Sequence, residues 1–218
     1  MLNEMNEGNQ HYFSSFPDSK VKIFTVSTSL RRHLYIFKTI TGVFSYRKLD
    51  LGTELLIKNM TIPKNQGTFL DLGCGYGAIG IVLANEINDS VIYLVDINKR
   101  AIWCTKENIK INIQDKKKNK LVTLEGDYFI PFQGKALKFD GIYMNPPLRQ
   151  GRKQFLEVCE KVPSLLKENG FFEFVIKKKM GAEYILNYFR NSIDAGNIYV
   201  TRKKSGYWLF HYDQLKTK

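Results

Sequence analysis

One short segment constrains the fold of this chain more than any other: residues 69–77, with the sequence FLDLGCGYG. The apolar residues 68–72 are typical of a buried strand, and residues 78–87 are typical of a helix. The glycines therefore lie on a turn between a strand and a helix. Glycine at such a turn lets the backbone approach a ligand closely at the carboxyl edge of a parallel sheet, although ordinary tight turns use glycine too.

Polar residues also follow the next three apolar runs of the chain. The runs 91–95, 121–124 and 139–144 are followed by Asp96, by Asp127 and by Asn145-Pro146-Pro147. The carboxyl ends of parallel strands meet at one edge of a sheet, so we expect these residues to lie close together. The pattern predicts a single site at that edge.

The order of the segments predicts an α/β fold. From residue 68 onward, expected strands alternate with expected helices, which is the pattern of a doubly wound, mostly parallel sheet. Helices are expected at residues 53–59, at 98–112 with Asn98 as the N-cap, at 154–167 ended by Gly170, and at 182–190, with a strand at 171–176. In the helix at 98–112, the buried stripe is expected to contain Ala101, Ile102, Thr105 and Ile109.

A β-hairpin is expected near each end of the chain. Residues 21–27 and 33–39 alternate apolar and polar side chains around a short turn, which predicts an N-terminal hairpin. Residues 197–201 and 207–212 are joined by a turn at residues 202–206, which is short enough to make them an antiparallel pair at the end of the sheet. Within the last strand, Tyr207 and Trp208 are expected in the core.

Length, charge and cysteine content limit the class of protein. A chain of 218 residues suits one domain, here divided into a tail (1–20), a hairpin-and-helix appendage packed on the core (21–60) and a main domain (61–218). No signal peptide or membrane-spanning segment is expected. Three dispersed cysteines argue against disulfides and a metal site, and for the cytoplasm. The net charge of +12 favours a nucleic-acid partner, although a lysine-rich genome would also produce it.

Two acids indicate the kind of ligand. Asp96, at the tip of the second strand of the sheet, is placed to accept hydrogen bonds from a ribose diol. Asp71 comes two residues before the first glycine, where a carboxylate would repel a pyrophosphate but suits an amino group. A ligand with an ammonium group, a ribose and an adenine is S-adenosylmethionine.

Several motifs together resemble those of class I S-adenosylmethionine-dependent methyltransferases, and more narrowly the small-domain methyltransferases. This group includes the ribosomal RNA guanine-N2 methyltransferases of the small-subunit type. The resemblance extends from about His11 to Phe210 and implies a Rossmann-like sheet of seven strands. Its motifs are GVFS (42–45) with DLG (50–52), DLGCGYGAIGI (71–81), DIN (96–98), NPPLRQGR (145–152) and VIKKK (175–179).

The resemblance implies a role for individual residues of the site. Asp71, Gly73 and Gly75 would bind the methionine end of the cofactor, with Cys74 between the glycines. Asp96 would bind the ribose hydroxyls, Ile97 would pack on the adenine and Asp127 would meet the adenine amino group. Asn145, beside the cofactor, and the Pro146 carbonyl would hold the target nitrogen, with Pro147 completing the catalytic motif. No metal is implied.

Substrate contacts are expected next to this motif. Many members of the family have an aromatic residue after the two prolines, whereas this chain has Leu148, so Phe44 is a second candidate for the surface on which the target base stacks. Arg149, Arg152 and Lys177 would bind phosphates of RNA near the target base, unless they only face solvent.

The favoured function is thus methylation of the exocyclic amine of guanine in ribosomal RNA. Two alternatives stay open: a protein glutamine N-methyltransferase, and a non-catalytic RNA-binding or ribosome assembly factor with the same fold. The sequence gives no prediction of the oligomeric state.

Overall fold

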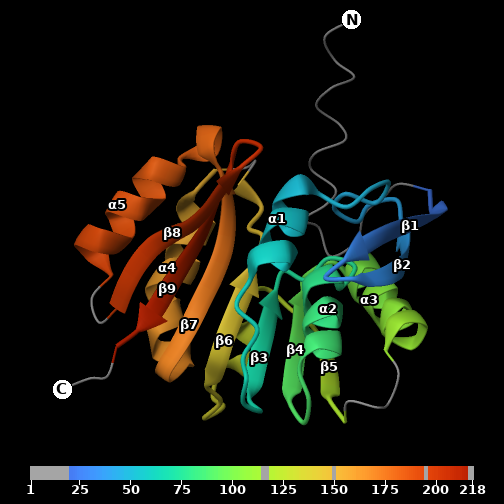
Figure 1. Ribbon diagram of the computed structural model, residues 1–218, viewed down its shortest axis with the longest axis horizontal. Coiled ribbons are helices and arrows are strands. Elements are labelled where there is room, and N and C mark those ends of the chain that lie inside the picture. The colour runs from blue at the N-terminus through green and yellow to red at the C-terminus, as the bar shows by residue number, and fades with distance from the viewer. Residues whose placement is uncertain (1–19, 114–117, 149–150, 194–195, 216–218) are drawn as a thin grey trace, which may run out of the picture.

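A computed structural model describes residues 20–113, 118–148, 151–193 and 196–215 of the chain (Figure 1). The predicted tail at residues 1–19 lies outside these ranges, as does Arg149. In the described part of the chain, no helix is both long and apolar enough to cross a bilayer.

A sheet of seven strands forms the centre of the molecule, in the order β5-β4-β3-β6-β7-β9-β8. β3, β4, β5, β6 and β7 pair in parallel, whereas β9 pairs antiparallel with both β7 and β8. The predicted fold class is confirmed. The strands are β3 (Thr68–Leu72), β4 (Val91–Asp96), β5 (Lys120–Glu125), β6 (Phe139–Met144), β7 (Leu166–Lys177), β8 (Gly196–Lys204) and β9 (Tyr207–Gln214).

Helices cover both faces of this sheet. One face packs against α1 (Leu51–Asn59), α2 (Ala78–Glu86) and α3 (Lys99–Asn112), and the other against α4 (Lys153–Leu165) and α5 (Ala182–Ser192). In Figure 1, α1 and α2 lie in front of the sheet and α4 lies behind it. The strands alternate accordingly: in β3, Phe69 faces the first core and Leu70 the second.

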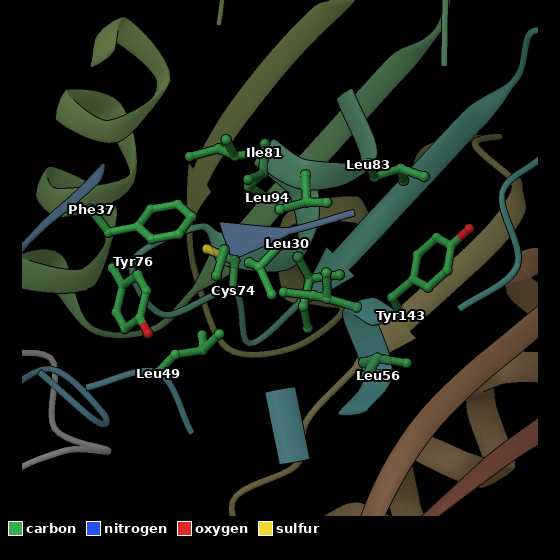
Figure 2. Close-up of a cluster of buried hydrophobic side chains, with 14 of the residues drawn as sticks. Leu30, Phe37, Leu49, Leu56, Cys74, Tyr76, Ile81, Leu83, Leu94 and Tyr143 are labelled. Carbon is green, nitrogen blue, oxygen red and sulfur yellow. The ribbon is translucent and has the colours of Figure 1, made fainter. Parts of the chain in front are cut away.

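The first core joins the N-terminal hairpin to the main sheet. The hairpin consists of β1 (Ile23–Leu30) and β2 (His33–Ile40), which pair only with each other among the described strands. Leu30 and Phe37 from the hairpin lie in one buried cluster with Ile81 of α2 and Leu94 of β4 (Figure 2). The predicted appendage therefore shares its core with the sheet, while the boundary at residue 60 stays a prediction.

Two asparagines of α3 bind the open edge of the hairpin. Asn112 accepts a hydrogen bond from the Ile36 backbone N–H (3.0 Å) and donates one to the Ile36 carbonyl (2.9 Å). Asn108 makes the same pair of bonds with Lys38, at 2.6 and 2.9 Å. Residues four apart on a helix are spaced about 6 Å, and residues two apart on a strand about 6.6 Å, so the two side chains match the edge of β2 as another strand would.

The expected N-cap is confirmed, and the buried stripe of α3 differs from the expected one because it includes Cys104 and Asn108 and lacks Ile109. Asn98 caps α3 by accepting from the backbone of Arg100 and Ala101. Ile109 is only half-buried, because the hairpin lies over the neighbouring turn and buries Asn108 instead.

Several expected boundaries were wrong, and two of them show how sheet pairing decides where an element ends. The helix expected at residues 154–167 ends at Leu165, and β7 begins at once with Leu166, which pairs with Phe139 of β6. Burial of Leu166 in this sheet pairing overrides its preference for a helix. At the other hairpin, Arg202, Lys203 and Lys204 belong to β8, and the turn is only Ser205-Gly206, where both residues have positive φ as a type I′ turn requires.

Candidate active site

A cavity of about 690 Å³ opens at the carboxyl ends of β3, β4, β6 and β7, a volume typical of ligand pockets. It lies where the sheet order reverses, since β3 has β4 on one side and β6 on the other. Residues from distant parts of the chain line it. They include Phe44, Asp50, Thr53, Gly73, Cys74, Gly75, Asp96, Ile97, Asp127, Asn145, Pro146, Pro147, Leu148, Lys177 and Tyr207.

The glycine loop forms the wall of this cavity with its backbone. Gly73 and Gly75 have φ of 71° and 58°, and a Cβ on either residue would meet no heavy atom within 4 Å. Side chains there would therefore project into open space at the cavity. The N–H groups of Gly73 and Cys74 both donate to the Val95 carbonyl at 2.9 Å, which holds the loop against β4.

Asp96 is held on the floor of the cavity by backbone donors. Its Oδ2 accepts from the Gly75 N–H at 2.8 Å and its Oδ1 from the Asn98 N–H at 2.8 Å. Burial nevertheless raises the pKa of Asp96 to about 6, because the charged form loses water. Each oxygen has a further lone pair, which suits it to accept from a diol.

Asp71 lies beneath the loop and is not among the residues that line the cavity. Its Oδ2 accepts from the Gly80 N–H at 2.8 Å, at the beginning of α2. Its Oδ1 is buried and has no hydrogen-bond partner within the described residues. Burial, with the nearby charge of Asp96, raises the pKa of Asp71 to about 7. Direct contact between Asp71 and a ligand therefore stays a prediction.

Asn145 has a fixed orientation at the end of β6. Its Nδ2 donates to Asp50 Oδ2 at 2.9 Å and to Thr53 Oγ1 at 2.8 Å, so both amide hydrogens are used. The amide oxygen is left as an acceptor for a ligand in the cavity. The Pro146 carbonyl accepts from the Leu148 N–H at 3.0 Å and retains its second lone pair.

Asp50 and Thr53 are site residues whose role the sequence did not reveal. Asp50 is the N-cap of α1, where Oδ2 also accepts from the backbone of Gly52 and Thr53. An acid before a helix predicts a cap. Its second bond, to Asn145, joins residues 95 positions apart in the chain, so only the folded structure reveals it.

Tyr207 packs against the core, as expected, but it also lines the cavity, which was not expected. It begins β9 on the face toward α1, and its hydroxyl lies 3.5 Å from Asp50 Oδ1. Trp208, on the opposite face, is buried as expected. Strand alternation predicts the two opposite faces, but not that the first one reaches the cavity.

Phe44 reaches the cavity from the turn that follows the N-terminal hairpin. The Asn98 side chain donates to the Gly42 carbonyl in this turn at 2.6 Å, and Arg100 donates to the Thr41 carbonyl at 3.0 Å. The cap of α3 thus fixes the turn beside Asp96. The sequence indicates Phe44 as a candidate for the stacking surface but does not predict its position.

The basic residues expected to bind substrate do not all gather at the cavity. Lys177 lines it and lies 5.6 Å from the ring centroid of Tyr207. Arg152 is not part of the lining, because its guanidinium stacks on Tyr184 at 4.4 Å. The expected contact of Arg152 with substrate stays a prediction.

Comparison with known proteins agrees with this geometry. A family model described as the methyltransferase small domain matches residues 34–211. The chain belongs to the methyltransferase small domain family. A Bacillus subtilis protein named Uncharacterized protein YbxB is 35% identical over 200 residues, covering 92% of this chain and 96% of that protein.

Relatives with a named activity match a smaller share of their own length. Ribosomal RNA small subunit methyltransferase C of Aeromonas hydrophila is 35% identical over 141 residues, 62% of this chain and 38% of that protein. The T. thermophilus 16S rRNA N2 G1207 methyltransferase, solved with AdoMet and guanosine, superposes with a TM-score of 0.71 at 22% identity. The superposition covers 91% of this chain and 52% of the T. thermophilus chain. The chain thus spans about half or less of these two proteins.

S-adenosylmethionine is the cofactor of this family, and the residues present fit it. The bare glycine backbone admits a ligand close to the turn, and Asp96 offers acceptors of the kind that a ribose diol needs. In its ionised form, the Asp71 carboxylate beneath the loop repels an anionic ligand and attracts a cationic one.

Proposed function

We propose that this protein transfers a methyl group from S-adenosylmethionine to the exocyclic amine of guanine in ribosomal RNA. The observation that carries the proposal is the fixed amide of Asn145. Its two hydrogens are bound by Asp50 and Thr53, so its oxygen is left to accept a hydrogen bond from a ligand that carries a donor. An exocyclic amine is such a donor.

The residues of the chain act mainly by positioning. When bound, the cofactor supplies a methyl group on a cationic sulfur that leaves readily as the nitrogen–carbon bond forms. An amine on a base is a poor nucleophile because its lone pair is delocalised into the ring. Asn145 Oδ1 and the Pro146 carbonyl would accept its two N–H bonds, which favours a pyramidal nitrogen with a localised lone pair.

The choice of RNA rests on charge and on the relatives. Lys177 lines the cavity with Tyr207, and its ammonium lies 5.6 Å from the Tyr207 ring centroid; Lys204 is the cross-strand neighbour of Tyr207 on β8. Cations beside an aromatic ring suit a nucleotide strand with phosphates and an exposed base. The named relatives are ribosomal RNA methyltransferases, and the reducing cytoplasm, where this RNA is found, suits three buried free cysteines.

The test is nucleoside mass spectrometry of ribosomal RNA from a strain that lacks the protein. We expect one N2-methylguanosine to disappear and to return with the wild-type gene but not with an Asn145→Ala gene. Loss of a different methylated nucleoside would replace guanine as the substrate. An unchanged nucleoside profile would contradict ribosomal RNA as the target.

A further inference from the structure

The carboxylate of Asp50 presents one well-satisfied oxygen and one that is nearly free. Oδ2 accepts three hydrogen bonds, from the N–H groups of Gly52 (2.8 Å) and Thr53 (3.0 Å) and from Asn145 Nδ2 (2.9 Å). Oδ1 has one long contact, with the Tyr207 hydroxyl at 3.5 Å. Asp50 and Tyr207 both line the cavity, so Oδ1 is an acceptor available to a ligand.

This free acceptor stands next to the one that holds the target amine. Asn145 Nδ2 donates a hydrogen bond to Asp50 Oδ2. Asn145 Oδ1 and Asp50 Oδ1 therefore belong to adjacent groups in the lining of the cavity. Two neighbouring acceptors match a ligand edge that carries two neighbouring donors. They repel an edge in which a donor stands beside a lone pair.

Only one common base that carries an exocyclic amine has that edge. Guanine presents its N2 amine beside the N1–H, which gives two adjacent donors. Adenine presents its N6 amine beside the bare N1, and cytosine presents its N4 amine beside the bare N3. Against a carboxylate, adenine and cytosine would leave two lone pairs facing each other at the second position.

We infer that Asp50 Oδ1 accepts the N1–H of the target guanine and so selects guanine over adenine and cytosine. The inference rests on the proposed function, because it takes Asn145 as the acceptor of the target amine. Asp50 then has two tasks with two oxygens: Oδ2 orients Asn145, and Oδ1 identifies the base. An enzyme that flips a nucleotide into its pocket reads it through this edge.

Asp50→Asn separates these two tasks. Three N–H donors surround Oδ2, so the new amide is expected to place its oxygen there and its NH₂ group where Oδ1 stands. Asparagine is also as good an N-cap as aspartate, so α1 should be preserved. The variant thus turns an acceptor into a donor at a single position of the cavity.

The experiment measures binding of guanosine, adenosine and 2-aminopurine riboside in the presence of S-adenosylhomocysteine, by calorimetry and, for 2-aminopurine riboside, also by fluorescence. 2-Aminopurine keeps the N2 amine but has a lone pair at N1. The wild type should bind guanosine about tenfold more tightly, the lower end of the discrimination that a two-bond base contact gives. Asp50→Asn should reverse this preference, and Asp50→Ser, which also caps a helix, should abolish it.

Two control variants exclude trivial explanations. Glu54→Gln removes a charge from the same turn of α1 outside the cavity lining and should keep the wild-type ratio. Thr53→Val removes a bond to Asn145 and should weaken both nucleosides alike.

The outcomes separate the inference from the proposed function. An unchanged guanosine to 2-aminopurine ratio in both Asp50 variants would overturn the role of Asp50 and leave guanine as the substrate. A wild type that prefers adenosine would overturn guanine itself. Binding of neither nucleoside by the wild type would show that the cavity does not recognise the base, and the inference would fall.

Discussion

Asp96 is a carboxylate whose chemistry depends on its burial. Burial raises its pKa to about 6, and the pKa of the neighbouring Asp71 to about 7. A diol donates to the ionised form, so ligand binding should favour loss of the proton, and affinity should rise with pH and level off above the raised pKa. We expect the Kd of S-adenosylhomocysteine to be about tenfold higher at pH 5 than at pH 7.5, measured by calorimetry. Affinity that is constant or falls over this range would contradict the account of Asp96.

Asn145 is expected to act on the transfer step and not on cofactor binding. Asn145→Ala removes the acceptor for the target amine but leaves the glycine loop and Asp96 intact. Transfer should fall by about 10²-fold or more, as when a single oriented polar group is removed from an active site. The Kd of S-adenosylhomocysteine should change by less than about threefold, and Asn197→Ala, on the exposed face of β8, should change neither. An equal loss of binding and transfer would make Asn145 a structural residue.

The sequence alone identifies those site residues that come directly after strands. Gly73, Asp96 and Asn145 line the cavity as expected. It misses Asp50 and Tyr207, because their contacts join α1, β6 and β9, which are far apart in the chain. Asp50 lies in the DLG motif at residues 50–52, but that motif assigns it no role in the site, and nothing local to Tyr207 marks it as part of the site.

Helix α3 connects the N-terminal hairpin to the glycine loop of the site. Asn108 binds the edge of β2, and its Nδ2 also donates to the Tyr76 carbonyl in the glycine loop at 2.9 Å. Asn112 binds the hairpin edge but, among the residues that the structure describes, makes no hydrogen bond to the glycine loop. Its Nδ2 also donates to the Asn108 carbonyl, and its own carbonyl accepts from Asn85 Nδ2 at 3.2 Å. The two residues should therefore differ in what their loss disturbs.

Asn112→Ala should loosen the hairpin without affecting the cofactor, whereas Asn108→Ala should affect both. Each substitution leaves backbone groups of β2 unpaired, at a cost of about 1–3 kcal/mol in the free energy of unfolding. Hydrogen exchange should quicken at Ile36 and Lys38 in both variants, and the Kd of S-adenosylhomocysteine should rise only in Asn108→Ala. Lys106→Ala, on the exposed side of α3, serves as the control. Equal cofactor affinity in the two asparagine variants would mean that α3 does not connect the hairpin to the loop.

Element boundaries were the weakest part of the sequence prediction, for a physical reason. The end of α4 at Leu165 is decided by pairing of Leu166 with Phe139, a contact across the sheet that local preference does not contain. The short turn at Ser205-Gly206 is decided by pairing of Lys204 with Tyr207. Where the period of the sequence sufficed, as in β3 and β6, the predicted bounds are those of the structure.

Across the whole molecule, the positive charge should produce a strong dependence of RNA binding on salt. Lys203 and Lys204 are exposed at the end of β8; Lys204 pairs with Tyr207, which lines the cavity, and the Lys203 ammonium lies 3.9 Å from the Trp208 ring centroid. If each contacts a phosphate, a Lys203→Glu, Lys204→Glu variant should reduce the slope of log K against log salt by about 1 for each lost contact. Filter binding over a range of salt concentrations measures this slope.

The matched control reverses two lysines away from the cavity. Lys64 precedes β3 and Lys120 begins β5, so both lie near the amino ends of the parallel strands. Lys64→Glu with Lys120→Glu makes the same change in net charge and should leave the slope nearly unchanged. Equal effects of the two double variants would mean that only net charge matters, and that β8 does not contact the RNA.

The central claim is transfer of a methyl group to the exocyclic amine of guanine, and product analysis tests it most directly. Purified protein is incubated with methyl-labelled S-adenosylmethionine and ribosomal RNA from a strain lacking the protein, and the RNA is then digested to nucleosides. We predict that the label appears in N2-methylguanosine and that Asn145→Ala gives none. Label in another nucleoside, or in protein in place of RNA, would contradict the claim.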